Sequence, residues 1–290
     1  MSYILAVDGG GTQCRAAIAT LDGTILGRAT AGSANMATDP QGAMASVVDA
    51  ARAALAAGGI ADTPLSSIHA YLGLAGANVE PDHSSLIAGL PFRDTRIVED
   101  SVIAVRGALG PDDGVMAVLG TGSVYGGRRN GQMLRAGGWG FVVGDQGSGA
   151  RIGRALMEQT LLAHDGVVPG SELTRSVMRE HGDAPNRIVA FGSTARPADF
   201  ARYAPLVFES ADRGDAIAMA VVAGAVADVN AALGAIVWDG CGHLCLTGGL
   251  AENYQNRLAQ KFVQILRPVR GNALAGAVEL AVETFATPKA

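Results

Sequence analysis

The sequence predicts an α/β protein of two domains, each with a mixed β-sheet that carries helices on its faces. The chain opens with three consecutive strand-like segments, after which strands and helices alternate. The same order of strand, glycine-rich turn and β-meander begins again near the middle of the chain. With 290 residues, of which 49% are hydrophobic, the chain is long enough for two cores rather than one.

The first half begins with the apolar run 3–7, which ends at Asp8 and three glycines. Apolar residues with a β-branched share, followed by glycines, are typical of a buried strand that enters a tight turn. A second patterned run over 15–20 places that turn in a β-hairpin. The other strands expected in this half lie at 24–29, 68–74 and 96–98, and the helices at 40–57, 81–90 and 101–109.

The turn cluster at 110–114, with the sequence GPDDG, is the strongest domain boundary signal in the chain. We expect a first domain over residues 1–109, joined by the last helix at about 274–290, and a second domain over 110–273. Strands of the second half are expected at 115–119, 124–128, 133–136 and 241–246, and helices at 148–163, 171–179, 199–211, 215–236, 251–266 and 274–285.

Composition excludes several classes of function. A net charge of −5 argues against a nucleic-acid surface, which is normally basic. No window approaches 18 uninterrupted apolar residues and no signal peptide is recognised, so we expect a cytoplasmic protein without a membrane span. The cysteines Cys14, Cys241 and Cys245 form no CxxC pair, and the apolar run around Cys241 and Cys245 favours buried thiols there. The histidines are scattered, which argues against a zinc site.

The first glycine turn, residues 8–12, has the chemistry of a phosphate site. Gly10 and Gly11 leave backbone N–H groups open to a ligand, and Thr12 adds a hydroxyl. Asp8 supplies a carboxylate for Mg²⁺, directly or through water. An ordinary glycine hairpin is the alternative interpretation of this turn alone. The chain has no GxxxxGK[ST] and no GxGxxG in a dinucleotide setting, which disfavours Walker ATPases and Rossmann dehydrogenases.

Taken together, the motifs resemble those of N-acetylglucosamine kinases in the BadF/BadG/BcrA/BcrD ATPase family, within the actin/hexokinase/Hsp70 superfamily. The resemblance covers essentially the whole chain, through DGGGT at 8–12, EDS at 99–101, LGTGS at 119–123, GGWG at 137–140, GDQGS at 144–148 and TGG at 247–249. It implies two actin-like (ribonuclease H-like) domains, each with a five-stranded type of sheet, and an ATP cleft between them.

The activity implied by the resemblance is an ATP- and Mg²⁺-dependent transfer of the γ-phosphoryl group to the 6-hydroxyl of N-acetylglucosamine or glucosamine. Asp100 would be the base that accepts the hydroxyl proton, although an aspartate at a helix start is also a common N-cap. Its neighbour Glu99 is the weaker candidate, because neighbours on a strand point to opposite faces. We expect a homodimer that binds a small amino sugar and neither nucleic acid nor a membrane.

The resemblance also implies the binding residues. Asp8 would hold Mg²⁺ through water, and Trp139 would either contact the sugar or only fix its loop. The residues implied for ATP are Gly10, Gly11, Thr12, Gly120, Thr121, Gly122, Gly248 and Gly249, and those implied for the sugar are Asn35, Asp100, Gly138, Trp139 and Asp145.

Two other functions remain compatible with the same fold. One is an ATPase activator of a CoA-ester dehydratase or reductase, which holds an iron–sulfur cluster with cysteines from two subunits. None of the three cysteines lies in the middle of this chain, where the activators carry theirs. The other is a sugar-sensing regulator with a kinase fold, against which the intact Asp8, Asp100 and Asp145 argue.

Overall fold

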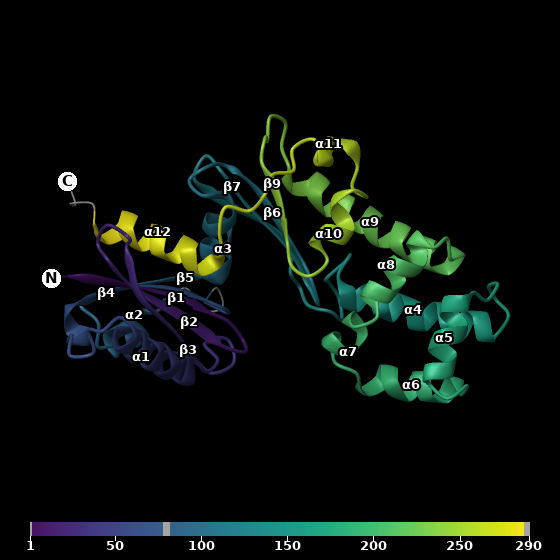
Figure 1. Ribbon diagram of the computed structural model, residues 1–290, viewed down its shortest axis with the longest axis horizontal. Coiled ribbons are helices and arrows are strands. Elements are labelled where there is room, and N and C mark those ends of the chain that lie inside the picture. The colour runs from purple at the N-terminus through teal and green to yellow at the C-terminus, as the bar shows by residue number, and fades with distance from the viewer. Residues whose placement is uncertain (1, 78–81, 287–290) are drawn as a thin grey trace. The chain divides into compact units, whose positions relative to one another are not determined.

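The computed structural model describes residues 2–77 and 82–286, and the chain divides into two compact units (Figure 1). Unit 1 comprises Met1–Asp112 and Val269–Ala290, and unit 2 comprises Asp113–Pro268. The chain therefore leaves unit 1, builds all of unit 2, and returns to unit 1 with its last helix. Each unit has its own sheet and its own buried core.

The sheet of unit 1 has five strands in the order β3-β2-β1-β4-β5. Its strands are β1 (Tyr3–Gly9), β2 (Cys14–Thr20), β3 (Ile25–Ala31), β4 (Ile68–Leu74) and β5 (Asp94–Glu99). The first three form an antiparallel meander, and β4 and β5 run parallel to β1. All five agree with the strands expected from the sequence to within two residues at each end.

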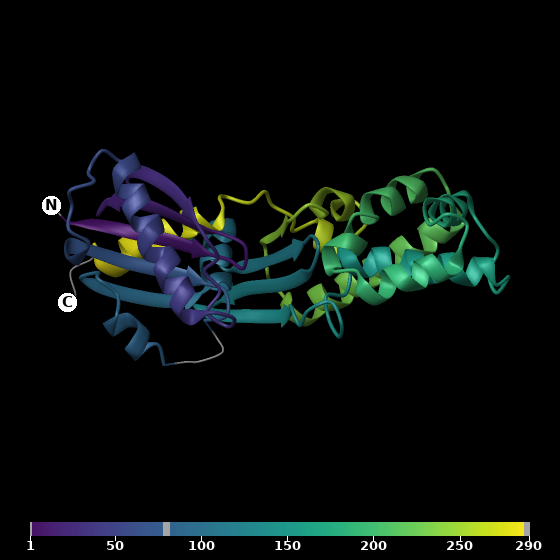
Figure 2. The same cartoon turned by 90° about the horizontal axis from the view of Figure 1, so that it is seen from below.

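Helices cover both faces of this sheet. Alternate residues of β1 belong to different cores: Leu5 and Val7 pack with α1 (Pro40–Ala57), whereas Ile4 and Ala6 pack with α12 (Ala273–Phe285). Figure 2 shows α1, in blue, and α12, in yellow, on opposite faces of the sheet. The remaining helices of unit 1 are η1 (Leu65–Ser67), α2 (Ser84–Ala88) and α3 (Asp100–Leu109). Only part of the helix expected at 81–90 forms, and Pro81 lies outside the described residues.

The last helix is fixed to unit 1 by close packing and by charge. A Cβ on Gly276 would lie 2.2 Å from the carbonyl oxygen of Ile103 in α3, so only glycine lets α12 approach this closely. Beside that contact, the buried guanidinium of Arg106 pairs with Glu279 at 2.6 Å and with Glu283. The C-terminal helix is therefore an integral part of the unit that contains the N-terminus.

The sheet of unit 2 has the order β8-β7-β6-β9. Its strands are β6 (Gly114–Leu119), β7 (Ser123–Arg129), β8 (Gln132–Gly137) and β9 (Leu244–Thr247). The first three again form an antiparallel meander, and β9 runs parallel to β6. Two mixed sheets flanked by helices confirm the predicted fold class. The second sheet differs from the expected five-stranded type, because it has four strands within the described residues.

Eight helices of unit 2 are described: α4 (Gly149–His164), α5 (Glu172–Glu180), α6 (Pro185–Thr194), α7 (Pro197–Ala201), α8 (Ala204–Asp212), α9 (Ala216–Ile236), α10 (Ala251–Gln255) and α11 (Gln260–Val263). The single helices expected at 199–211 and 251–266 were wrong, because each is a pair of shorter helices. The second pair separates where the Asn230 side chain accepts a hydrogen bond from the Ala259 N–H at 2.9 Å. Helix α6, which has Pro185 in its first turn, was not predicted from the sequence.

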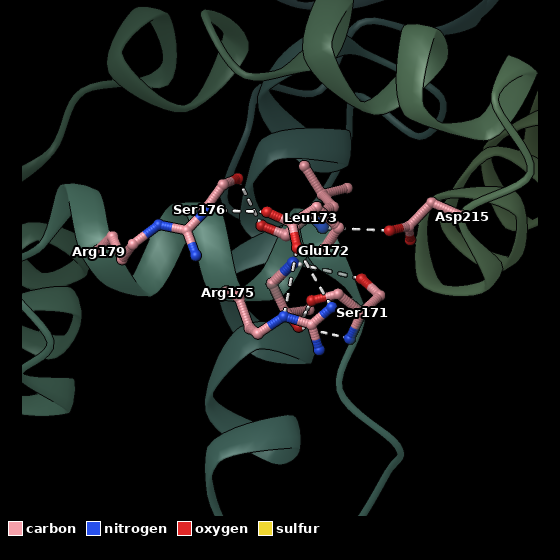
Figure 3. A network of polar contacts seen from close by, with 8 residues as sticks. Ser171, Glu172, Leu173, Arg175, Ser176, Arg179 and Asp215 are labelled. Carbon is pink, nitrogen blue, oxygen red and sulfur yellow. Dashed lines mark hydrogen bonds and ion pairs between the residues drawn. The ribbon is translucent and has the colours of Figure 1, made fainter.

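One carboxylate joins two of these helices (Figure 3). Asp215 caps α9 by accepting hydrogen bonds from the N–H groups of Ile217 and Ala218, and it also accepts one from Leu173 in α5, each at 3.1 Å. Burial acts to raise the pKa of Asp215, but the hydrogen bonds from Ala218 and Leu173 outweigh it and lower the pKa below 3.8. The ionised form of Asp215 is therefore part of the folded structure.

Among the described helices, α9 alone is long and apolar enough to cross a membrane, which is weak evidence by itself. In the structure, Val222, Val229 and Leu233 of this helix pack in the core of unit 2. The buried face of α9 thus has a structural explanation in the fold of this unit.

Candidate functional site

The first glycine turn connects β1 to β2 and exposes Gly11 and Thr12. The N–H of Gly10 already donates to the carbonyl of Gln13 at 3.0 Å, so Gly10 offers no free amide to a ligand. The Gly10 carbonyl accepts a hydrogen bond from Ala34 at 3.0 Å, which attaches the loop that follows β3 to the turn. An exposed hydroxyl and amide therefore remain at this turn for an anion.

Asp8, at the mouth of this turn, is buried to 8% exposure and pairs with the guanidinium of Arg15. Arg15 was not predicted from the sequence, although the two residues lie directly opposite each other in the β1–β2 register. No cluster of three metal-ligating side chains occurs in the part of the chain that is described. One carboxylate is enough for Mg²⁺, because this ion usually keeps several water ligands and also binds the phosphates of its substrate.

Asn35 lies beside the same turn. Its side-chain oxygen accepts a hydrogen bond from Ala37 at 2.9 Å, and its Nδ2 lies 3.7 Å from where a Cβ on Gly11 would stand. Within residues 2–77 and 82–286, no protein acceptor bonds to Nδ2. The amide can therefore donate hydrogen bonds to a ligand next to the turn.

Asp100 is exposed and is the first residue of α3, directly after β5. The N-cap position belongs to Glu99, whose carboxylate makes no cap hydrogen bond and instead accepts one from the Ser101 hydroxyl at 3.1 Å. In the parallel register, Gly9 lies opposite Leu74, and Leu74 lies opposite Glu99. The first turn, the Asn35–Ala75 bridge and Asp100 therefore follow the carboxyl ends of three neighbouring strands, where ligands of open α/β sheets bind.

In unit 2, the second turn follows β6 and is bound to the start of α4. The N–H groups of Gly149 and Ala150 donate to the carbonyls of Gly120 and Thr121 at 2.8 and 3.2 Å. These bonds hold the turn backbone, while Thr121 remains exposed. The second turn thus offers a fixed, accessible hydroxyl.

A third turn, Thr247 to Gly249, follows β9 and lies against the second one. Gly248 packs so closely on β6 that a Cβ there would lie 2.3 Å from the Leu119 carbonyl oxygen. The N–H of Leu250 donates to the same carbonyl at 2.9 Å. Because β6 and β9 are parallel neighbours, the structure brings these two predicted ATP-binding turns together.

Asp145 also lies at this end of the sheet. Its carboxylate is 2.8 Å from where a Cβ on Gly122 would stand, so the second turn needs glycine at that position to make room for it. Asp145 is buried, with 9% exposure, and its backbone is in the left-handed region, with φ of 56°. No protein donor among the described residues reaches this carboxylate. A buried carboxylate without a donor costs free energy until a ligand satisfies it.

The other residues of the long glycine loop are open. Trp139 has 73% exposure, and the guanidinium of Arg135 lies 5.5 Å from the centre of its ring. Its indole is therefore not buried in the core, and Gly138 before it has φ of 73°. Behind the loop, a groove of about 340 Å³ runs from Gly147 between α4 and α9. Small residues of α9 line the groove, and Arg151 and Asp228 supply charge.

The chain is similar to known proteins over nearly its whole length. The model of the BadF/BadG/BcrA/BcrD ATPase family matches residues 5–278. The chain is similar to the glucosamine kinase GspK of Vibrio cholerae, with 35% identity over 97% of this chain and 96% of that one. It is also similar to an N-acetylmuramic acid/N-acetylglucosamine kinase of Clostridium acetobutylicum, with 28% identity over 82% of this chain and 80% of that one.

Among solved structures, the chain resembles a proposed N-acetylglucosamine kinase from Chromobacterium violaceum. The TM-score is 0.79 and the sequence identity 32%, over 97% of this chain and 99% of that one. The similarity therefore extends over both units.

Proposed function

This chain belongs to the BadF/BadG/BcrA/BcrD ATPase family, and from that premise we propose that it transfers the γ-phosphoryl group of ATP to the 6-hydroxyl of glucosamine or N-acetylglucosamine. The family expected from the motifs is confirmed, and the named relatives make the chain an amino-sugar kinase that uses ATP. The position of the acceptor hydroxyl, the Mg²⁺ requirement and the roles of single residues are the proposed part.

The unpartnered carboxylate of Asp145 is the observation that supports a sugar substrate most directly. Two hydroxyls of a sugar ring would donate to its oxygens and satisfy it. The carboxylate also lies against Gly122 of the second turn, so a sugar bound there would be next to the phosphates that the turn is proposed to hold. In unit 1, the free Nδ2 of Asn35 would donate to a further sugar hydroxyl.

For ATP, we assign the phosphates to the exposed hydroxyls and amides at Thr12 and Thr121, and the adenosine to Gly248 and Gly249. Mg²⁺ would be held by Asp8 through water and would neutralise charge on the phosphates. The guanidinium of Arg15, half exposed beside Asp8, adds a positive charge at the same turn. Phosphoryl transfer depends mainly on positioning and charge of this kind.

Asp100 is assigned as the base. A carboxylate at the first position of α3 is exposed to a substrate, and the structure leaves the N-cap position to Glu99. It would orient the sugar 6-hydroxyl and accept its proton as the phosphoryl group moves.

The iron–sulfur activator is disfavoured by the three cysteines. Cys14 and Cys245 have 0% exposure and Cys241 has 7%, so none presents a thiolate for a cluster shared with a second subunit. These buried thiols agree with the sequence prediction.

A cytoplasmic homodimer that binds neither nucleic acid nor a membrane remains part of the proposal.

The proposal is tested by ADP release from ATP and Mg²⁺ with a panel of sugars. Glucosamine, N-acetylglucosamine, N-acetylmuramic acid and glucose are compared with a sugar-free control. We expect release that depends on glucosamine or N-acetylglucosamine and is at least tenfold slower with glucose. ADP release at the same rate without any sugar would contradict the proposal.

A further inference from the structure

The backbone next to Asp145 is held by hydrogen bonds from three side chains. The Gln146 carbonyl accepts from the hydroxyls of Ser123, at 2.8 Å, and Tyr125, at 3.4 Å. The Gly147 carbonyl accepts from the hydroxyl of Tyr254 at 2.5 Å. The turn that carries the buried carboxylate is thus fixed from behind.

The bond from Tyr254 is the most deeply buried of the three. Tyr254 has 0% exposure, and its ring packs edge-on against Phe208 with ring centres 5.4 Å apart. Burial raises the pKa of the Tyr254 phenol far above its ordinary value, so the hydroxyl keeps its proton and remains a donor. Tyr254 belongs to α10, which begins two residues after Gly249 of the third turn.

We propose that Tyr254 is a positioning residue that holds the Gly147 carbonyl so that the Asp145 carboxylate faces the sugar. This inference rests on the proposed function, because it takes Asp145 as a sugar ligand. Asp145 has a left-handed backbone that non-glycine residues rarely adopt, and such a conformation persists only where its surroundings fix it. The hydroxyl of Tyr254 is one of the groups that fix it.

A positioning role predicts a specific kinetic change. Without the bond, Gly147 and the neighbouring Asp145 gain freedom, and the carboxylate spends less time in the geometry that meets the sugar. Misplacement of a binding group by a fraction of an ångström lowers the sugar affinity, whereas the second turn keeps its own backbone bonds from Gly149 and Ala150 of α4. The KM for the sugar should therefore change more than the KM for ATP.

The experiment compares Tyr254→Phe with wild type and with Tyr203→Phe. The first variant removes only the hydroxyl and keeps the ring against Phe208. Tyr203 is a matched control, because it is also buried in unit 2 but its hydroxyl contacts the carboxylate of Glu180 at 2.8 Å instead of the loop. We expect Tyr254→Phe to raise the sugar KM roughly 5- to 30-fold. The ATP KM of this variant, and both KM values of Tyr203→Phe, should stay within about twofold of wild type.

Protection against heat gives a second readout that does not depend on turnover. The sugar should raise the Tm of wild type and Tyr203→Phe, and should raise that of Tyr254→Phe much less. Should Tyr254→Phe not fold, Ser123→Ala takes its place, because it releases the Gln146 carbonyl of the same turn and should also raise the sugar KM.

An unchanged sugar KM in Tyr254→Phe, or an equal rise in the ATP KM, would overturn the inference. Failure of the proposed function looks different, because wild type itself would then show no turnover with any amino sugar, and the inference would fall with it.

Discussion

Unit 1 and unit 2 share the order of their first strands and turn, but they differ in whether the buried carboxylate beside that turn has a partner in the protein. Each unit places a glycine turn after the first strand of a meander, and each has an aspartate beside that turn. Asp8 and Asp145 are almost equally exposed, at 8% and 9%. Asp8 has a counter-ion in Arg15, whereas Asp145 has no protein donor among the described residues. The first is satisfied by the protein, and the second needs a ligand.

This difference separates two kinds of functional carboxylate. An aspartate that pairs with a cation of the protein is held in place with or without substrate, which suits a group that holds metal-bound water beside phosphates. An aspartate without a donor gains most when a ligand with hydroxyls binds, which suits a substrate-selecting group. The pair Asp145→Ala and Asp8→Ala tests this division directly. The effect expected on substitution falls from Asp100 through Asp145 and the two threonines to Asp215.

Asp100→Asn should reduce kcat by about 10² to 10⁴, the usual contribution of a positioned base. The amide keeps the shape but cannot accept the proton, and the ATP KM should change little because Asp100 is assigned to the sugar. Steady-state rates at saturating ATP and sugar measure this change. The neighbouring Glu99→Gln is the control and should keep kcat within a few-fold of wild type. Full activity in Asp100→Asn would leave Glu99 or Asp145 as the base.

Asp145→Ala should raise the sugar KM by roughly 10- to 150-fold, because a hydrogen bond to a charged group contributes about 1.5–3 kcal/mol. Asp8→Ala is the variant to compare with it. Because Asp8 is assigned to Mg²⁺, this substitution should raise the concentrations of ATP and Mg²⁺ that the reaction needs and should change the sugar KM less. Full kinetics in both substrates separate the two variants. Equal effects of Asp145→Ala on the two KM values would assign Asp145 to the metal or to the closure of the enzyme instead.

Thr12→Val and Thr121→Val should each raise the ATP KM by roughly 2- to 12-fold, the range for one hydrogen bond of about 0.5–1.5 kcal/mol. Valine keeps the size of threonine and removes the hydroxyl. The sugar KM serves as the internal control and should change less. Unchanged ATP kinetics in both variants would remove the assignment of a phosphate turn to each unit.

Asp215→Asn should lower the free energy of unfolding at neutral pH by about 1 kcal/mol, because hydrogen bonds to a charged acceptor are stronger than those to an amide. It should also flatten the dependence of stability on acid pH. The folded pKa of Asp215 lies below its ordinary value of 3.8, so its contribution is present above the unfolded pKa and is lost as the pH falls through the folded pKa. Urea unfolding between pH 7 and pH 3 measures this. The exposed Asp165→Asn is the control. Parallel losses of stability with acid in wild type and Asp215→Asn would contradict the assignment.

The sequence predicted most elements because their local signals are strong. The helix predicted at 40–57 has the bounds of α1, where Asp39 accepts a hydrogen bond from the Gly42 N–H and Pro40 lies in the first turn. The signals failed where a tertiary contact decides. The helix expected at 251–266 is interrupted where Asn230, far away in sequence, bonds to Ala259. Local patterns do not contain that information.

The candidate site shows the same limit. The turns and Asp100 were proposed through the resemblance of their motifs to a family, but Arg15 and Tyr254 were not. Arg15 matters through the register that places it opposite Asp8, and Tyr254 through a bond to Gly147 that spans 107 positions of sequence. Neither residue belongs to a motif, so only the folded structure reveals its neighbours.

The central claim is transfer of a phosphoryl group to the 6-hydroxyl of an amino sugar, and ³¹P NMR of the reaction mixture tests it most directly. ATP, Mg²⁺ and glucosamine or N-acetylglucosamine are incubated with the protein, and the proton-coupled spectrum is recorded. A phosphate ester at position 6 is coupled to the two protons of one CH₂ group, so we predict a new triplet beside the signals of ADP. A doublet, which marks a phosphate on a ring CH, or inorganic phosphate as the only product would contradict the claim.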